Sequence, residues 1–280
     1  MSPNLGEVLM SKQGQACPSF ENPPVIETVL SVQFEALQAF STVHFGLFWE
    51  KVRNRFPETK DHPALPPTIE QQQDSASVAR MRFEAVDSLT PQRLWLLNQP
   101  NTEMIQVQND RFVKNWRSIK GNKYPRYVDS IKPVFERDFK EFKNFIENEE
   151  LGEIKVNQCE VTYVNHIVSG EGWDNFDEFE KIFTTWKQAD VNEFPGKADD
   201  YTWRSRYPIL DSKKEWIGRL YVDVQPALRV GDNKPMYVMN LTARGMCGNS
   251  FDFFDIGHEA IVKSFKNLTT LNIHKIWKEK

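Results

Sequence analysis

The chain has little cysteine. Its three cysteines, Cys17, Cys159 and Cys247, lie far apart, and no Cys-x-x-Cys pair or Cys/His cluster occurs. Such spacing favours neither a disulfide framework nor a zinc site, so we expect no metal. The N-terminal residues lack the basic region and apolar run of a secretory leader. The sequence therefore predicts a protein of the reducing cytoplasm.

Long apolar runs and glycine-rich nucleotide motifs are also missing. No stretch approaches the about 20 apolar residues that a membrane span requires. The patterns G-x-x-x-x-G-K-S/T, G-x-G-x-x-G and G-x-S-x-G do not occur, which disfavours a phosphate loop, a dinucleotide fold and a serine-hydrolase elbow. We therefore expect no membrane association, no cofactor and no set of catalytic residues.

A basic excess is lacking as well. The 35 Lys and Arg residues are outnumbered by 39 Asp and Glu residues, which gives a net charge of −4. General nucleic-acid binders usually carry the opposite balance, although a local basic patch is enough for some. The composition therefore disfavours a general nucleic-acid binder.

What the chain does have is material for a core. It contains 40% hydrophobic residues, with 20 Phe and 8 Trp among its 280 residues, which is ordinary globular composition with room for two modest domains. The pattern Arg-Leu-aromatic-x-x-x-Gln-Pro occurs twice, at residues 93–100 and 219–226. Such an echo indicates an internal repeat.

Hydrophobic periodicity predicts the same order of elements in both halves, β-α-β-β-β-α. Residues 1–22 read as a loose arm, 23–150 as a first unit and 151–280 as a second, with residues 57–78 as a long connection. The expected strands are 25–35, 79–86, 92–98, 104–116, 155–168, 201–209, 216–224 and 236–244, and the expected helices are 41–56, 127–148, 176–188, 254–268 and 271–278.

This order predicts an α+β fold in which two tandem units each form an antiparallel sheet backed by helices. It resembles the TATA-binding-protein or helix-grip class, in which a curved sheet cradles a long C-terminal helix. The resemblance concerns architecture, and no function follows from it.

Four short stretches bear on family membership: residues 23–29, 126–131, 159–167 and 257–277. Together they resemble a bacterial protein family of unknown function that is sporadically distributed across genomes. The resemblance covers nearly the whole chain from Pro23 onward and implies no activity, cofactor or catalytic residue. Sporadic distribution suggests mobile or defence-related gene neighbourhoods.

One histidine stands beside a partial metal motif. His258-Glu259 begins like the zinc helix His-Glu-x-x-His, but Val262 occupies the position of the second ligand. His258 also belongs to an apolar helical stripe with Ile261 and Phe265. We therefore expect a hydrogen-bonded packing residue.

Polar side chains alternate along the first strand of the second half. Period two places Glu160 and His166 on one face of residues 155–168. Three interpretations stay open: a half-solvated sheet with cross-strand ion pairs, a binding surface, and an acid–base site for an anionic substrate. Neighbouring strands are expected to add further cations to this face: Arg204, Arg206 and Arg219.

Residues 111–127 are the most basic segment of the chain. Cations attract phosphates and aromatic rings stack on bases. The segment is interpreted as a solvated loop that offsets the acidic run at 147–153, as a nucleic-acid or nucleotide site, or as a contact for an acidic protein. Its candidate binding residues are Arg111, Lys114, Trp116, Arg117, Lys120, Lys123 and Arg126.

These patterns favour a binding protein over an enzyme. The leading hypothesis is a non-enzymatic accessory subunit that binds a protein partner within a multi-component bacterial system, for which antiviral defence is one setting. The first alternative is nucleic-acid or nucleotide binding through residues 111–127. The second is an enzyme that uses Glu160 and His166.

Overall fold

The computed structural model describes residues 17–72, 93–119, 121–187, 196, 198–246 and 251–280. Within these residues, nine strands form one open antiparallel sheet in the order β2-β3-β4-β5-β1-β6-β9-β8-β7, packed with five helices. The expected α+β class is confirmed. The tandem arrangement of two equivalent units stays a prediction.

The strands are β1 (Val25–Phe34), β2 (Glu58–His62), β3 (Arg93–Leu97), β4 (Glu103–Gln108), β5 (Arg111–Arg117), β6 (Val156–Val168), β7 (Trp203–Leu210), β8 (Trp216–Leu228) and β9 (Pro235–Gly245). The helices are α1 (Thr42–Val52), α2 (Lys132–Asn148), α3 (Phe179–Ile182), α4 (Asp252–Leu268) and α5 (Leu271–Trp277). A π-helical turn, Tyr127–Ile131, precedes α2, and a 3-10 turn, Phe176–Glu178, precedes α3.

The chain divides into two compact units. Unit 1 comprises Met1–Thr28, Thr162–Ala243 and Asp255–Lys280, and unit 2 comprises Val29–Val161 and Arg244–Phe254. Each unit has its own helix-backed core.

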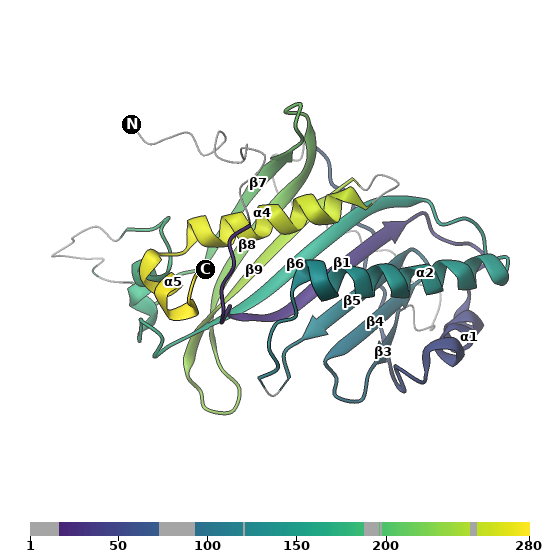
Figure 1. Ribbon diagram of the computed structural model, residues 1–280, viewed down its shortest axis with the longest axis horizontal. Helices are drawn as coiled ribbons and strands as arrows, with labels where there is room; N and C mark the ends of the chain where they lie inside the picture. The colour runs from purple at the N-terminus through teal and green to yellow at the C-terminus, as the bar shows by residue number, and fades with distance from the viewer. Residues whose placement is uncertain (1–16, 73–92, 120, 188–195, 197, 247–250) are drawn as a thin grey trace. The chain divides into compact units, whose positions relative to one another are not determined.

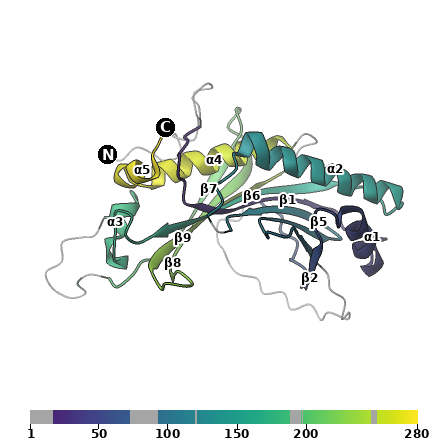
Figure 2. The same cartoon turned by 60° about the horizontal axis from the view of Figure 1, so that its bottom comes forward.

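Unit 2 is built around an aromatic core between α2 and the strands. Phe135, Phe139 and Phe142 recur every three or four residues and so share one face of α2. Their rings lie 5.2–5.9 Å from the ring of Phe112 on β5. Helix α2 runs along one side of β1 and β5 (Figures 1 and 2). Aromatic burial of this kind supplies much of the stability of a small core.

A charged cluster interrupts this core. The Lys114 ammonium lies 2.6 Å from Glu103 and 2.9 Å from the fully buried Asp138 of α2. Burial disfavours the charged form of Asp138, but Lys114 and hydrogen bonds from Arg55 and Arg137 outweigh it, so the pKa of this carboxyl lies below its usual range. The pair is therefore ionised and fixes α2 to β5.

Unit 1 packs α4 against β6. The Tyr163 hydroxyl of β6 and His258 Nδ1 of α4 are 2.8 Å apart, and burial lowers the pKa of His258 to about 4, against the opposing charges of Asp255 and Glu259. The neutral ring thus has the packing role that its stripe predicted.

The beginning and end of the described chain also meet in unit 1. The Glu21 N–H donates to the Lys278 carbonyl, and the Lys280 N–H donates to the Ser19 carbonyl, at 3.0 and 2.8 Å. The Phe20 ring packs edge-on against Phe265. Residues 17–22 of the expected loose arm are therefore held in place, and the rest of that arm lies outside the described residues.

The first half differs from the predicted pattern at two places in the described residues. The expected strand 104–116 is a hairpin, because Asn109 and Asp110 turn the chain between β4 and β5. Strand β2 lies in the stretch expected to be a connection. The expected strand 79–86 lies outside the described residues.

The expected helix 176–188 is much shorter in the structure. Helix α3 ends at Ile182, where Phe183 turns to an extended conformation and forms a β-bridge with Thr269. The Thr184 N–H then donates to the Leu268 carbonyl at 3.0 Å. Tertiary pairing has overridden the helical spacing of the aromatic residues.

The repeated sequence pattern begins in two different strands. Residues 93–100 begin in β3 and residues 219–226 lie in β8, and each of these strands is second from an edge of the sheet. The interpretation of the echo as an internal repeat stays a prediction.

Candidate functional site

Unit 2 has a polar sheet face on the side opposite α2. Along β1, Leu30, Val32 and Phe34 are buried in the core, and period two turns the alternate residues Ser31 and Gln33 the other way. The cross-strand register places residues of β3, β4 and β5 on this face in one row: Arg93 lies opposite Gln108, and Gln108 lies opposite Arg111.

An extended segment, residues 63–72, crosses this face, and we call it the strap. It begins with Pro63 and contains Pro66 and Pro67. Proline has no N–H to donate, so a segment with three prolines is poorly suited to a strand inside a sheet. The strap instead lies over the side chains of the sheet.

Side chains from four strands hold the strap by its main chain. The Leu65 N–H donates to the Gln108 side-chain oxygen at 2.9 Å, and the Gln108 amide donates back to the Leu65 carbonyl at 2.8 Å. Arg111 Nη2 donates to the Pro66 carbonyl at 3.0 Å. The Thr68 N–H donates to Gln33 at 2.8 Å, and the Glu70 N–H donates to Gln158 at 3.0 Å.

The anchors follow the order of the strands. Gln108, Arg111, Gln33 and Gln158 belong to β4, β5, β1 and β6, which are successive neighbours in the sheet. Neighbouring strands are about 4.8 Å apart, so this crossing spans about 14 Å. Five extended residues span about 16 Å at most, which matches the step from Leu65 to Glu70. The strap therefore runs across the strands in a nearly extended form.

The glutamines of this row, which we call the clamp residues together with Arg111, are buried and bonded. Gln33, Gln108 and Gln158 are 3–4% exposed. Each of their amide groups also donates to an acceptor beside the strap: Asp110 for Gln108, and Asn157 for both Gln33 and Gln158. Buried amides that satisfy their hydrogen-bonding capacity hold a fixed orientation, so the row is preorganised.

Charges flank the row on β9 and β6. Arg244 Nε donates to the Glu160 carboxylate at 2.7 Å, and its Nη1 lies 3.9 Å from the buried Glu70 carboxylate of the strap. Burial lowers the pKa of the Arg111 guanidinium, and Arg244 lowers it further, against Asp110 and Glu160. The Arg111 Nε is buried and has no hydrogen-bond partner among the described residues.

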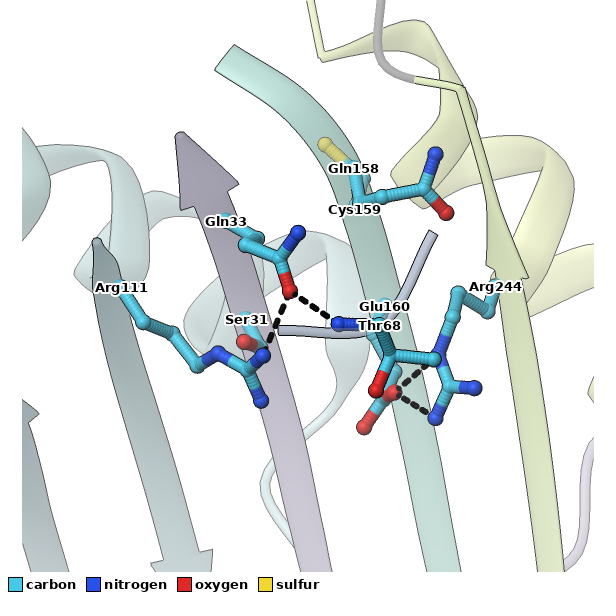
Figure 3. A pocket seen from close by; sticks show the side chains of 8 residues that line it. All are labelled: Ser31, Gln33, Thr68, Arg111, Gln158, Cys159, Glu160 and Arg244. Atoms are coloured by element: carbon cyan, nitrogen blue, oxygen red, sulfur yellow. Dashed lines mark hydrogen bonds and ion pairs between the residues drawn. The ribbon is translucent and has the colours of Figure 1, made fainter. Parts of the chain in front are cut away.

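A cavity with room for about one water molecule opens beside Thr68. Figure 3 shows side chains from β5, β1, β6 and β9 converging there beneath the strap. Its lining residues are Ser31, Gln33, Thr68, Arg111, Gln158, Cys159, Glu160 and Arg244.

The basic segment does not form one surface. Arg111 and Arg117 take the strap side of β5, whereas Lys114 and Trp116 take the side of α2, where Lys114 is buried in its ion pairs. Trp116 packs against Tyr124. Of the other candidates, Lys123 and Arg126 are exposed beyond the strand, and Lys120 lies outside the described residues.

The candidates of unit 1 lie on a more open face. Arg204 pairs with Asp223, and Arg206 lies opposite Tyr221 in the β7–β8 ladder. Arg219 lies opposite Pro208 and is 8% exposed. His166 is half-buried, and burial together with Arg229 lowers its pKa.

Arg111 and Glu160 are candidates from the sequence, and the structure places both at the cavity beside Thr68. The candidates selected from the sequence do not include Gln33, Gln108, Gln158 or Arg244. The signal in the sequence was a glutamine at a polar, alternate position of each of several strands, but the order of those strands in the sheet was unknown. The strap was hidden because a proline-rich connection looks like an ordinary loop.

Metal and membrane features are absent from the described part of the chain. No group of three or more His, Cys, Asp or Glu residues there is arranged to hold a metal ion. None of the described helices combines the length and apolarity needed to cross a bilayer. Cys159 takes part in a disulfide bond, which the cysteine spacing did not predict, while Cys17 is free.

Comparison with known protein families and with curated proteins finds no match to this chain. The resemblance to a sporadically distributed bacterial family therefore stays a prediction, and the proposals below depend on the geometry of unit 2.

Proposed function

We propose that this protein is a non-enzymatic binding subunit whose clamp residues in unit 2 engage an extended segment of a protein partner. The family resemblance expected from the sequence supports a role for such a subunit in a multi-component bacterial system, for which antiviral defence is one setting. The proposal extends the accessory-subunit hypothesis by giving it a binding face.

One observation carries the proposal: the clamp residues already hold a peptide main chain. Gln108, Arg111, Gln33 and Gln158 bond the strap at four successive strands. Extended peptides are commonly recognised through main-chain hydrogen bonds, which supply affinity for many sequences. A face that is built for one extended segment has the chemistry to accept another.

The ionisable groups of this face favour binding over catalysis. The Glu160 carboxylate accepts two hydrogen-bonding contacts from Arg244, at 2.7 and 2.5 Å. A general base needs a lone pair directed at a substrate proton, and pairing with a guanidinium opposes that role. The arrangement supports a positioning function for Glu160, which orients Arg244 toward Glu70.

The test is a pull-down from the native host with a photo-crosslinking amino acid at Glu35. This exposed side chain lies two positions after Gln33, next to the clamp residues. The matched control carries the same amino acid at Val230, which is 98% exposed in unit 1. We expect a protein partner that crosslinks from position 35 and not from position 230.

A partner that crosslinks from position 230 alone, or an eluate without protein, would contradict the proposal. Nucleic acid in the eluate that disappears in Lys123→Glu/Arg126→Glu would instead support the exposed part of the basic segment. That outcome would replace the clamp residues as the binding site.

A further inference from the structure

We infer that the strap is a built-in competitor, which occupies a peptide site that an extended segment of another polypeptide takes when the strap is displaced. This inference rests on the proposed function, because it assigns the ligand class and the regulation of the same clamp residues. It goes further in treating residues 65–70 as a ligand in cis.

The clamp residues bond the strap through its main-chain atoms. The clamp bonds use the N–H groups of Leu65, Thr68 and Glu70 and the carbonyls of Leu65 and Pro66. All of these are main-chain atoms, which every peptide carries. The clamp residues therefore recognise an extended backbone, and a peptide of different sequence in the same extended form presents the same donors and acceptors.

Apart from Glu70, whose buried carboxylate faces Arg244, the side chains of the strap anchor it weakly. Ile69 is 57% exposed, and Pro66 and Pro67 are exposed as well. A segment that buries little apolar surface gains little from the hydrophobic effect. Displacing it exchanges one set of main-chain hydrogen bonds for an equivalent set, and the net free-energy difference of such an exchange is small.

The buried clamp residues need hydrogen-bond partners even when no ligand is bound. Gln33, Gln108 and Gln158 lie almost fully buried beneath the strap. Vacating the face would leave amide groups without partners or expose them to water, at a cost for each unsatisfied group. A strap that fills the face until a ligand arrives avoids that cost in the free protein.

The contacts also define the chemistry of the ligand. It is an extended peptide with N–H groups at positions that match Leu65, Thr68 and Glu70. Proline is accepted between them, since the strap itself has Pro66 and Pro67 there. An acidic side chain at the last position faces Arg244, as the Glu70 carboxylate does at 3.9 Å. The buried Arg111 Nε is free of partners among the described residues and can donate one further bond.

The experiment uses the full chain and a fluorescent synthetic peptide with the sequence of residues 62–72. In Thr68→Pro the strap loses the N–H that donates to Gln33, while the sheet keeps its clamp residues. The control is Ile69→Pro, which places proline one position later, where the N–H is not among the clamp bonds. Glu70→Pro removes the bond to Gln158 and is an independent second variant if Thr68→Pro does not fold.

We expect Thr68→Pro to bind the peptide about three- to tenfold more tightly than the wild-type chain or Ile69→Pro, the range for one lost hydrogen bond. Peptide with Ile69→Ala should bind equally well, whereas N-methylation at its Thr68 position should weaken binding.

Equal affinity, or no binding, in folded Thr68→Pro and wild-type chains would overturn the inference. So would tight binding to Thr68→Pro that survives N-methylation of the peptide at its Thr68 position. The two proposals fail separately: a host partner that crosslinks at position 35 and is not displaced by the peptide would keep the proposed function and remove the strap as its competitor. Peptide binding without a host partner would do the reverse.

Discussion

Two polar sheet faces of this protein arise from the same kind of strand and behave differently. In unit 2, the glutamines among the clamp residues are buried beneath the strap and are bonded to its main chain. In unit 1, the ladder of β7 and β8 carries Arg204 and Asp223 as an exposed pair, with Gln225 exposed beside them. On both faces, the polar side chains occupy alternate positions along the strands, as the two-residue period of a strand requires.

The difference lies in what covers each face. An exposed ion pair contributes little stability, because water competes for both charges. A buried amide or charge is either fully bonded or costly. The polar residues of unit 2 are therefore expected to be far more sensitive to substitution than their counterparts in unit 1, and the predictions below test that contrast.

The largest effect should come from the buried carboxylate of unit 2. Asp138→Ala removes the partner of Lys114 and Arg55 and should lower the free energy of unfolding by about 3–5 kcal/mol. The matched control, Asp223→Ala in the exposed pair of unit 1, should lose less than about 1 kcal/mol. Denaturant unfolding measures both, and similar losses would break the comparison.

The second effect belongs to the buried polar group of unit 1. Burial lowers the pKa of His258 from 6.5 to about 4. The unfolded chain therefore takes up a proton first as the pH falls. The stability contributed by the neutral ring is complete above pH 6.5 and is lost between pH 6.5 and 4, by up to about 3 kcal/mol.

His258→Gln keeps a hydrogen-bonding group for Tyr163 but does not titrate. It should flatten the pH dependence of the unfolding free energy between pH 4 and 6.5. His44→Gln, in a half-exposed position of unit 2, is the control and should leave that dependence in place. An unchanged slope in His258→Gln would show that other groups set it.

The smallest loss of stability is expected at single amide side chains, one from each face. Gln158→Ala leaves the buried Glu70 N–H without its acceptor and should cost about 1–3 kcal/mol. Gln225→Ala, at an exposed amide of unit 1, should change stability by no more than about 0.5 kcal/mol. Thermal and denaturant unfolding distinguish the two variants. If Gln158→Ala leaves stability unchanged, water replaces the Gln158 side chain as the acceptor of the Glu70 N–H.

Local patterns in the sequence predicted much of the fold. Alternation in the sequence separates Leu30, Val32 and Phe34 from Gln33, and the spacing of Phe135, Phe139 and Phe142 marks the buried face of α2, as the structure shows. These features depend on neighbours within one element, so periodicity is sufficient to find them.

The candidate site depends on non-local information that the sequence lacks. Gln108, Arg111, Gln33 and Gln158 converge because β4, β5, β1 and β6 are neighbours, and strand order is not encoded in periodicity. Lys114 looked like part of a basic surface because its charge was counted along the chain, but alternation in β5 turns it toward Asp138. The strap looked like a loop because its partners are side chains.

The strap also acts as a check on strand register. A slip of one residue in β1, β4, β5 or β6 would turn the clamp residue of that strand toward the helix side of the sheet. The strap would then lose an anchor in addition to the misplaced core side chains. One short segment therefore depends on the register of strands from three separate stretches of the sequence, because it completes its hydrogen bonds only when all four strands are correctly aligned.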